Sequence, residues 1–107
     1  MTEFTLHDLE KRVQDRAKAD PSASYTRALI DRGMAHCAKK LGEEAVEVAI
    51  AALAEGRERV VAETADLFYH LLVLLHARGI SLAEVEAELS ARTQYSGLEE
   101  KAARKGG

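Results

Sequence analysis

Two consecutive stretches decide the fold: MAHCAKKLGEEAVEVAIAALAE at Met34–Glu55 and ERVVAETADLFYHLLVLLHAR at Glu58–Arg78. Both are rich in Ala, Leu, Val and Glu, and neither shows the alternation of apolar and polar residues that is typical of a strand. Gly56 and Gly79 follow them, and glycine commonly ends a helix. The sequence therefore predicts two long helices, which we expect to pack antiparallel.

The rest of the chain is also predicted to be helical. Ser or Thr followed three residues later by an acidic residue is a signal that opens a helix. Such signals at Thr5 and Ser81, and Ser24 as a cap by itself, predict further helices over about 5–20, 24–33 and 81–92, with Pro and Gly as helix-ending residues. A break is expected at 94–97, and a short helix or mobile tail over 98–105. No repeat or long linker divides the chain, so we expect one all-α domain over 1–107, a bundle of four to five helices.

Composition limits the class of protein. Hydrophobic residues make up 47% of the 107 residues but aromatic residues only 5%, so Ala, Leu and Val must fill the core. A single helical chain of this length would leave much apolar surface exposed, and we therefore expect a homo-oligomer. The formal net charge of −3 argues against nucleic-acid binding, which needs a basic surface.

Compartment can also be predicted. The N-terminal residues show no apolar run that resembles a signal peptide, and the longest apolar run, Leu71–Leu75, is too short to span a bilayer. Cys37 is the only cysteine, so no intrachain disulfide can form and a reducing compartment fits. We expect a soluble cytoplasmic protein that does not bind membranes.

The first long helix has a predicted core face and an acidic edge. The core stripe is expected at Leu41, Ala45, Val48 and Ala52. At 100° per residue, Glu44 and Glu47 flank this stripe, where a site can be sheltered yet open to ligand, and Glu43 lies farther toward the outside.

The second long helix is apolar around most of its circumference from Thr64 to Leu75, so we expect much of it to be buried. Its polar residues fall in one narrow strip: Arg59, Glu63, Asp66 and His70. Buried carboxylates need a partner because an unpaired buried charge is costly, and a cation is the obvious one.

Together these acids predict a metal site. Carboxylates three residues apart project side by side from a helix, so two antiparallel helices can present four acids to one pocket: Glu44, Glu47, Glu63 and Asp66. Oxygen ligands alone favour Mg²⁺, or Mn²⁺, over iron or zinc. A single acidic pair would usually be a solvated face, and a di-iron site would need Glu-x-x-His pairs, which are absent from the sequence.

These motifs resemble a known superfamily. Gly42-Glu43-Glu44-Ala45-Val46-Glu47 and Glu63-Thr64-Ala65-Asp66-Leu67-Phe68-Tyr69-His70 are similar to the Glu-Glu-x-x-Glu and Glu-x-x-Asp motifs of the MazG-like all-α nucleotide pyrophosphohydrolases. Three flanking stretches resemble the phosphoribosyl-ATP pyrophosphatase family within it: Ser24-Tyr25-Thr26, Lys40-Leu41-Gly42-Glu43-Glu44 and Ser96-Gly97-Leu98-Glu99-Glu100-Lys101.

The resemblance implies an activity and a set of residue roles. The family hydrolyses the bond between the α- and β-phosphates of phosphoribosyl-ATP, giving phosphoribosyl-AMP and pyrophosphate, in the second step of histidine biosynthesis. By position, Mg²⁺ would be held by Glu44, Glu47, Glu63 and Asp66. Glu43 would complete the shell or orient the attacking water. Members generally dimerise, and a chain of this length would be a stand-alone form without a cyclohydrolase domain.

Four further residues are predicted to contact the substrate: Lys40, Arg27, Tyr25 and His70. Lys40 can bind a phosphate or pair with Glu44, four residues on. Tyr25 can stack on a base or ribose, whereas Tyr69 fits helix packing better. His70 can contact substrate, contact Asp66, or lie on the surface.

Two other functions remain open at this level. One is a housekeeping enzyme that hydrolyses non-standard or excess nucleoside triphosphates, which only the flanking stretches disfavour. The other is a helical dimerisation module in which the acids only form ion pairs with Arg and Lys.

Overall fold

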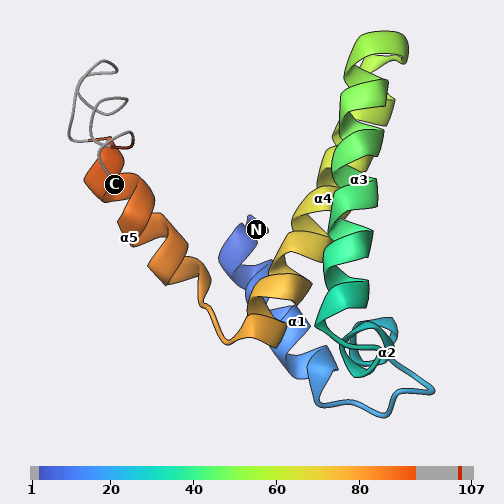
Figure 1. The fold of residues 1–107 in the computed structure, drawn as a ribbon, viewed down its shortest axis with the longest axis vertical. Helices are drawn as coiled ribbons and strands as arrows, with labels where there is room; N and C mark the ends of the chain where they lie inside the picture. Colours follow the sequence, from blue (N-terminus) through green and yellow to red (C-terminus); the bar gives the residue numbers. More distant parts are fainter. Residues whose placement is uncertain (1–2, 94–103, 105–107) are drawn as a thin grey trace.

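The computed structural model describes residues 3–93 and 104, and these contain five helices and no strand. The helices are α1 (Leu6–Ala17), α2 (Tyr25–Asp31), α3 (Met34–Ala54), α4 (Arg57–Arg78) and α5 (Leu82–Arg92). The long helices α3 and α4 run side by side as an antiparallel hairpin, with α1 and α2 near its base and α5 pointing away from it (Figure 1). The predicted all-α fold is confirmed. The expected features over 94–103 lie outside the described residues.

Local hydrogen bonds explain where the helices begin and end. Thr5 and Ser81 each accept a hydrogen bond from a backbone N–H three residues on, and the acidic side chain there accepts one in return, so both predicted capping boxes are present. Gly79 has a φ of 77°, a left-handed conformation that favours glycine and ends α4. The sharp turn after it sets the direction of α5.

The end of α1 differs from the prediction. The helix stops at Ala17 rather than near Asp20. The Asp20 carboxylate accepts hydrogen bonds from the Ser22 backbone N–H, at 2.8 Å, and from its hydroxyl. A side chain that binds the backbone in this way stabilises a turn rather than a helix, and this turn contains Pro21.

The core lies at the base of the hairpin, where all five helices contribute to it. Its buried members are Val13, Leu29, Cys37, Leu72, Val73 and Leu82. Beyond this base, the two long helices touch each other through small residues such as Ala51, which is completely buried. The core therefore fixes α1 and α2 against the lower half of α3 and α4.

The core stripe expected on α3 is right only in part. Leu41 and Val48 are half-buried, but Ala45 and Ala52 are exposed, whereas Cys37, Glu44 and Ala51, spaced seven residues apart, lie on the side that is buried or half-buried. Glu44, expected to flank the core, thus faces α4, while Glu47 is exposed. Apolar residues cover two sides of α3, and only one of these sides packs against other helices of the chain.

The burial expected for α4 is also too high. In the segment from Thr64 to Leu75, the buried residues are His70, Leu72 and Val73, while Phe68 is exposed. Among the described residues, α4 is the one helix long and apolar enough to cross a membrane by length and composition, a test that the core helix of a soluble protein also passes. In the structure α4 packs against α3 and buries Glu63, His70, Leu72 and Val73.

A core substitution tests this arrangement. Leu29 is 2% exposed, so Leu29→Ala should lower the free energy of unfolding by about 2–5 kcal/mol through lost burial and a cavity. Urea denaturation followed by circular dichroism measures the change. The same substitution at the exposed Leu89 should cost less than about 1 kcal/mol. Equal losses at both positions would contradict the placement of the core.

Candidate metal centre and nucleotide pocket

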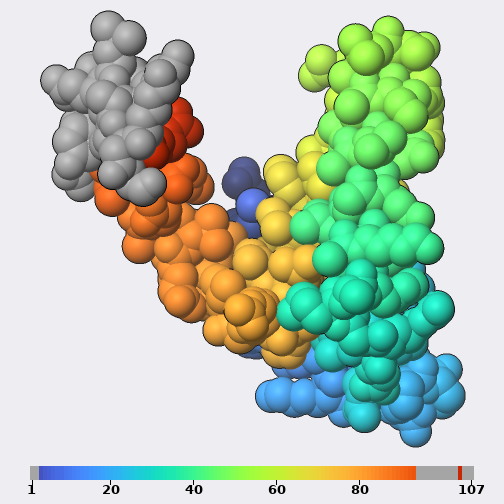
Figure 2. All heavy atoms as spheres, in the orientation of Figure 1, coloured from blue at the N-terminus to red at the C-terminus, as the bar shows by residue number. Residues whose placement is uncertain are grey.

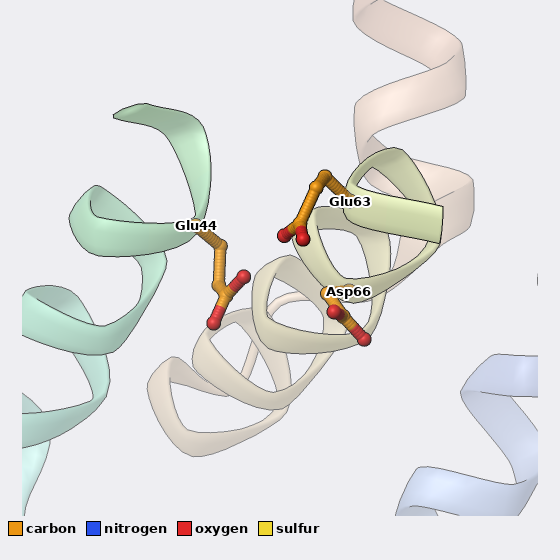
Figure 3. Close-up of side chains that lie close together, drawn as sticks. All are labelled: Glu44, Glu63 and Asp66. Atoms are coloured by element: carbon orange, nitrogen blue, oxygen red, sulfur yellow. The ribbon is translucent and has the colours of Figure 1, made fainter. Parts of the chain in front are cut away.

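Three carboxylates gather where α3 faces α4. One oxygen from each of Glu44, Glu63 and Asp66 lies within 4.8 Å of the others. Figure 3 shows Glu44 on α3, and Glu63 and Asp66 on α4, with the Glu63 carboxylate directed toward Glu44. Glu63 is buried, Glu44 half-buried and Asp66 exposed. A divalent cation prefers oxygen ligands of this kind, and the exposed Asp66 leaves the cluster open on one side.

Arg59 and His70 border the cluster. The Arg59 guanidinium, one turn before Glu63 on α4, donates a hydrogen bond to the Glu63 carboxylate and also pairs with Glu55 at 3.4 Å. The Nε2 atom of His70 lies 4.0 Å from Glu44 Oε1, too far for a direct hydrogen bond. Burial lowers the pKa of His70, and the nearby Glu44 only partly opposes this shift. At neutral pH the imidazole therefore adds no full positive charge.

The other two predicted acids lie outside the cluster. Glu43 is exposed and pairs with Lys40 at 3.3 Å, so Lys40 binds the acid three residues on rather than Glu44. The hydrogen bond to Glu43 raises the pKa of Lys40. Glu47 is exposed and lies one turn further along α3. The structure thus brings together three of the five predicted acids.

A pocket of about 670 Å³ opens beside the cluster, within the size range of small-molecule sites. Its polar and aromatic lining residues are Arg16, Ser24, Tyr25, Thr26, Asp66, Tyr69 and His70. Asp66 belongs to both the cluster and the pocket wall, so the pocket adjoins the cluster at this carboxylate.

Aromatic rings form one wall of this pocket. Tyr25 and Tyr69 are stacked with centroids 6.4 Å apart, and His70 meets Tyr69 edge-on at 5.1 Å. The Tyr69 hydroxyl is hydrogen-bonded to Thr26 Oγ1 at 2.6 Å, and burial raises the pKa of Tyr69. Tyr25 is 60% exposed, so its free face can stack on a base or ribose. Tyr69 thus both packs between helices and lines the pocket.

The basic residues of the pocket differ from the sequence prediction. Arg27 donates to Asp31 at 3.0 Å and to the Ala19 carbonyl at 3.1 Å, and it does not line the pocket. Arg16 on α1 does. No motif marks Arg16 in the sequence. Only the packing of α1 and α2 on α4 brings it near Asp66.

Fold and site together define an all-α protein with a candidate divalent-metal centre next to a nucleotide-sized pocket. The sequence profile of the phosphoribosyl-ATP pyrophosphohydrolase family matches residues 6–93, and the chain belongs to this family. The resemblance predicted from the acidic motifs and their flanks is confirmed.

Similar proteins cover nearly the whole chain. The chain is 60% identical to phosphoribosyl-ATP pyrophosphatase 1 of Bradyrhizobium diazoefficiens over 105 residues, 98% of this chain and 99% of that protein. It is 61% identical to phosphoribosyl-ATP pyrophosphatase of Azorhizobium caulinodans over 100 residues, 94% of this chain and 92% of that protein. Phosphoribosyl-ATP pyrophosphatase 1 of Rhodopseudomonas palustris is 56% identical over 105 residues, 98% of each chain.

A metal titration tests the cluster. Glu44→Gln should weaken Mn²⁺ binding by about tenfold or more, because even groups that only support metal ligands contribute 10- to 100-fold. Isothermal titration calorimetry measures the affinity. Glu58→Gln makes the same change at an exposed site in the first turn of α4, and it should bind Mn²⁺ as the wild type does. Unchanged affinity in Glu44→Gln would exclude Glu44 as a ligand.

Proposed function

We propose that this chain hydrolyses phosphoribosyl-ATP to phosphoribosyl-AMP and pyrophosphate, the second step of L-histidine biosynthesis, with Mg²⁺ as the metal and Mn²⁺ as a substitute. The observation that carries the chemistry is the cluster of Glu44, Glu63 and Asp66, which opens onto an aromatic-lined pocket. The family profile and the names of relatives at 56–61% identity support the choice of substrate.

In this proposal the three clustered carboxylates would hold the metal, and Glu47, one turn further along α3, would be a fourth ligand. A bound divalent cation neutralises phosphate charge, polarises the phosphoryl group and lowers the pKa of a coordinated water. Glu43, at the margin of the site, completes the shell or orients the attacking water. Because Glu43 is paired with Lys40, a shift of the Glu43 side chain would also move the Lys40 ammonium group.

The pocket residues place the rest of the substrate. Tyr25 offers an exposed ring to the base or ribose, and the hydrogen bond between the Thr26 and Tyr69 hydroxyls holds Tyr69 in place behind it. His70 lies between Tyr69 and Glu44, with its ring edge-on to Tyr69 and its Nε2 atom 4.0 Å from Glu44 Oε1. Lys40 is proposed to bind a phosphate of the substrate, and its ion pair with Glu43 would break when it does so. Arg27 would have to break its ion pair with Asp31 before it could bind a phosphate.

We also propose that the protein is a cytoplasmic homodimer. The hairpin exposes apolar side chains along both long helices: Val46, Ile50 and Leu53 on α3, and Val61 and Phe68 on α4. Figure 2 shows the upper part of this hairpin standing clear of the other helices. Contiguous apolar surface of this kind marks an interaction site, and a second copy offers the same surface in return.

A substrate panel tests the proposed reaction. With Mg²⁺ present, the wild type should release pyrophosphate from phosphoribosyl-ATP with kcat/KM at least about 100-fold above that for ATP or modified deoxynucleoside triphosphates, since a site that binds an extra group discriminates by more than 1–3 kcal/mol. Asp66→Asn should reduce kcat by about 100-fold or more with the helical spectrum unchanged. Release from ordinary triphosphates but none from phosphoribosyl-ATP would instead favour a housekeeping pyrophosphohydrolase.

The oligomeric state tests the proposed interface. Light scattering coupled to size exclusion should give twice the 11.7 kDa of one chain. Leu53 is 89% exposed in the single chain, and Leu53→Glu should shift the equilibrium toward monomer because it places a charge in an apolar contact. Leu89→Glu, a matched change on α5, should remain dimeric. A monomeric wild type would contradict the proposed interface.

A further inference from the structure

Arg16 is the guanidinium that faces the pocket, and nothing established for the reaction assigns it a role. It lies in the last turn of α1. No ion pair or side-chain hydrogen bond among residues 3–93 and 104 uses its side chain, whereas the side chains of Arg27, Lys40 and Arg59 are all engaged with acids. An exposed guanidinium at a pocket wall with no acidic partner is available for an anionic ligand.

The backbone around Arg16 is held in place. Ser24 Oγ donates to the Arg16 carbonyl at 2.8 Å and accepts from the Arg27 backbone N–H at 3.1 Å. This buried serine therefore ties the end of α1 to the start of α2. Val13, three residues before Arg16, is fully buried in the core. The position of Arg16 relative to the ring of Tyr25 is thus fixed by two independent contacts.

The pocket is lined by groups of opposite charge, the Asp66 carboxylate and the Arg16 guanidinium. The acidic cluster at Asp66 can hold a phosphate only through a cation. Arg16 can hold one directly, and its positive charge is near enough to the Tyr69 hydroxyl to oppose, in part, the rise in pKa that burial causes there. Phosphoribosyl-ATP has two anionic ends to match, a triphosphate and the phosphate monoester of its phosphoribosyl group. Ordinary ATP has only the first.

We propose that Arg16 binds the phosphate monoester of the substrate's phosphoribosyl group and so distinguishes phosphoribosyl-ATP from ATP. This inference rests on the function proposed above. The triphosphate then lies at Glu44, Glu63 and Asp66, and the nucleoside spans the aromatic wall between them. Arg16 is a specificity-determining residue in this arrangement and takes no part in the cleavage of the phosphoanhydride bond.

Steady-state kinetics of Arg16→Gln test this inference. Loss of a bidentate, charge-assisted contact should raise the KM for phosphoribosyl-ATP by about 10- to 100-fold, and kcat should stay within about threefold. Product inhibition locates the contact. Inhibition by phosphoribosyl-AMP should weaken by a similar factor, while inhibition by pyrophosphate should not change. Arg16→Lys should recover part of the loss, because it restores the charge but not the fork.

Arg12→Gln is the matched control. It removes the same charge one turn earlier on α1, where the guanidinium lies 4.8 Å from the centre of the Phe4 ring and does not line this pocket, and its kinetics should equal those of the wild type. An unchanged KM in Arg16→Gln, or a parallel loss of pyrophosphate inhibition, would overturn the assignment while leaving the proposed function intact. A wild type inactive on phosphoribosyl-ATP would overturn both.

Discussion

The contact between α3 and α4 at Glu44, Glu63 and Asp66 is the constraint on which the rest of the structure depends. Three carboxylates within 4.8 Å repel one another, and Glu63 is also removed from water. Like charges in a partly buried place weaken the packing of the helices that carry them. The fold must therefore hold these two helices together by other means.

Two features supply that compensation. The apolar core is concentrated at the base of the hairpin, where Leu72 and Val73 on α4 meet Cys37 on α3. Near the cluster, the Arg59 guanidinium is bound to Glu63, and the exposed side of Asp66 remains in contact with solvent. The cluster thus stays open to a cation on the side of Asp66, while the contacts of the core hold the two helices together. His70 contributes by volume rather than by charge, since burial favours its neutral form.

Much of the fold could be predicted from the sequence because its helix ends are encoded locally. Thr5 and Ser81 with their acidic partners, and Gly79 with its positive φ, place the helix boundaries within a few residues. The face of α3 could not be predicted in the same way. Its apolar residues cover more than one side, and helical periodicity does not say which side packs within the chain. The exposed Ala45 and Ala52 lie on the side that the periodicity favoured.

The residues of the candidate site also differ in whether the sequence alone could predict their positions. Glu63 and Asp66 are three residues apart on one helix, and such neighbours project side by side whatever the tertiary structure. Whether Glu44 or Glu47 joins them depends on the rotation of α3, which only the packing decides, and here Glu44 faces α4. The role of Arg16 in lining the pocket cannot be predicted from neighbouring residues at all, because it results from the docking of α1 and α2 against α4. The proposed metal site therefore depends on one hairpin, while the proposed contacts of Arg16 and Tyr25 depend on how the N-terminal helices dock against that hairpin. Val13 on α1 and Leu29 on α2 belong to the same buried core as Cys37, Leu72 and Val73 of the hairpin, so one core joins the two parts of the candidate site.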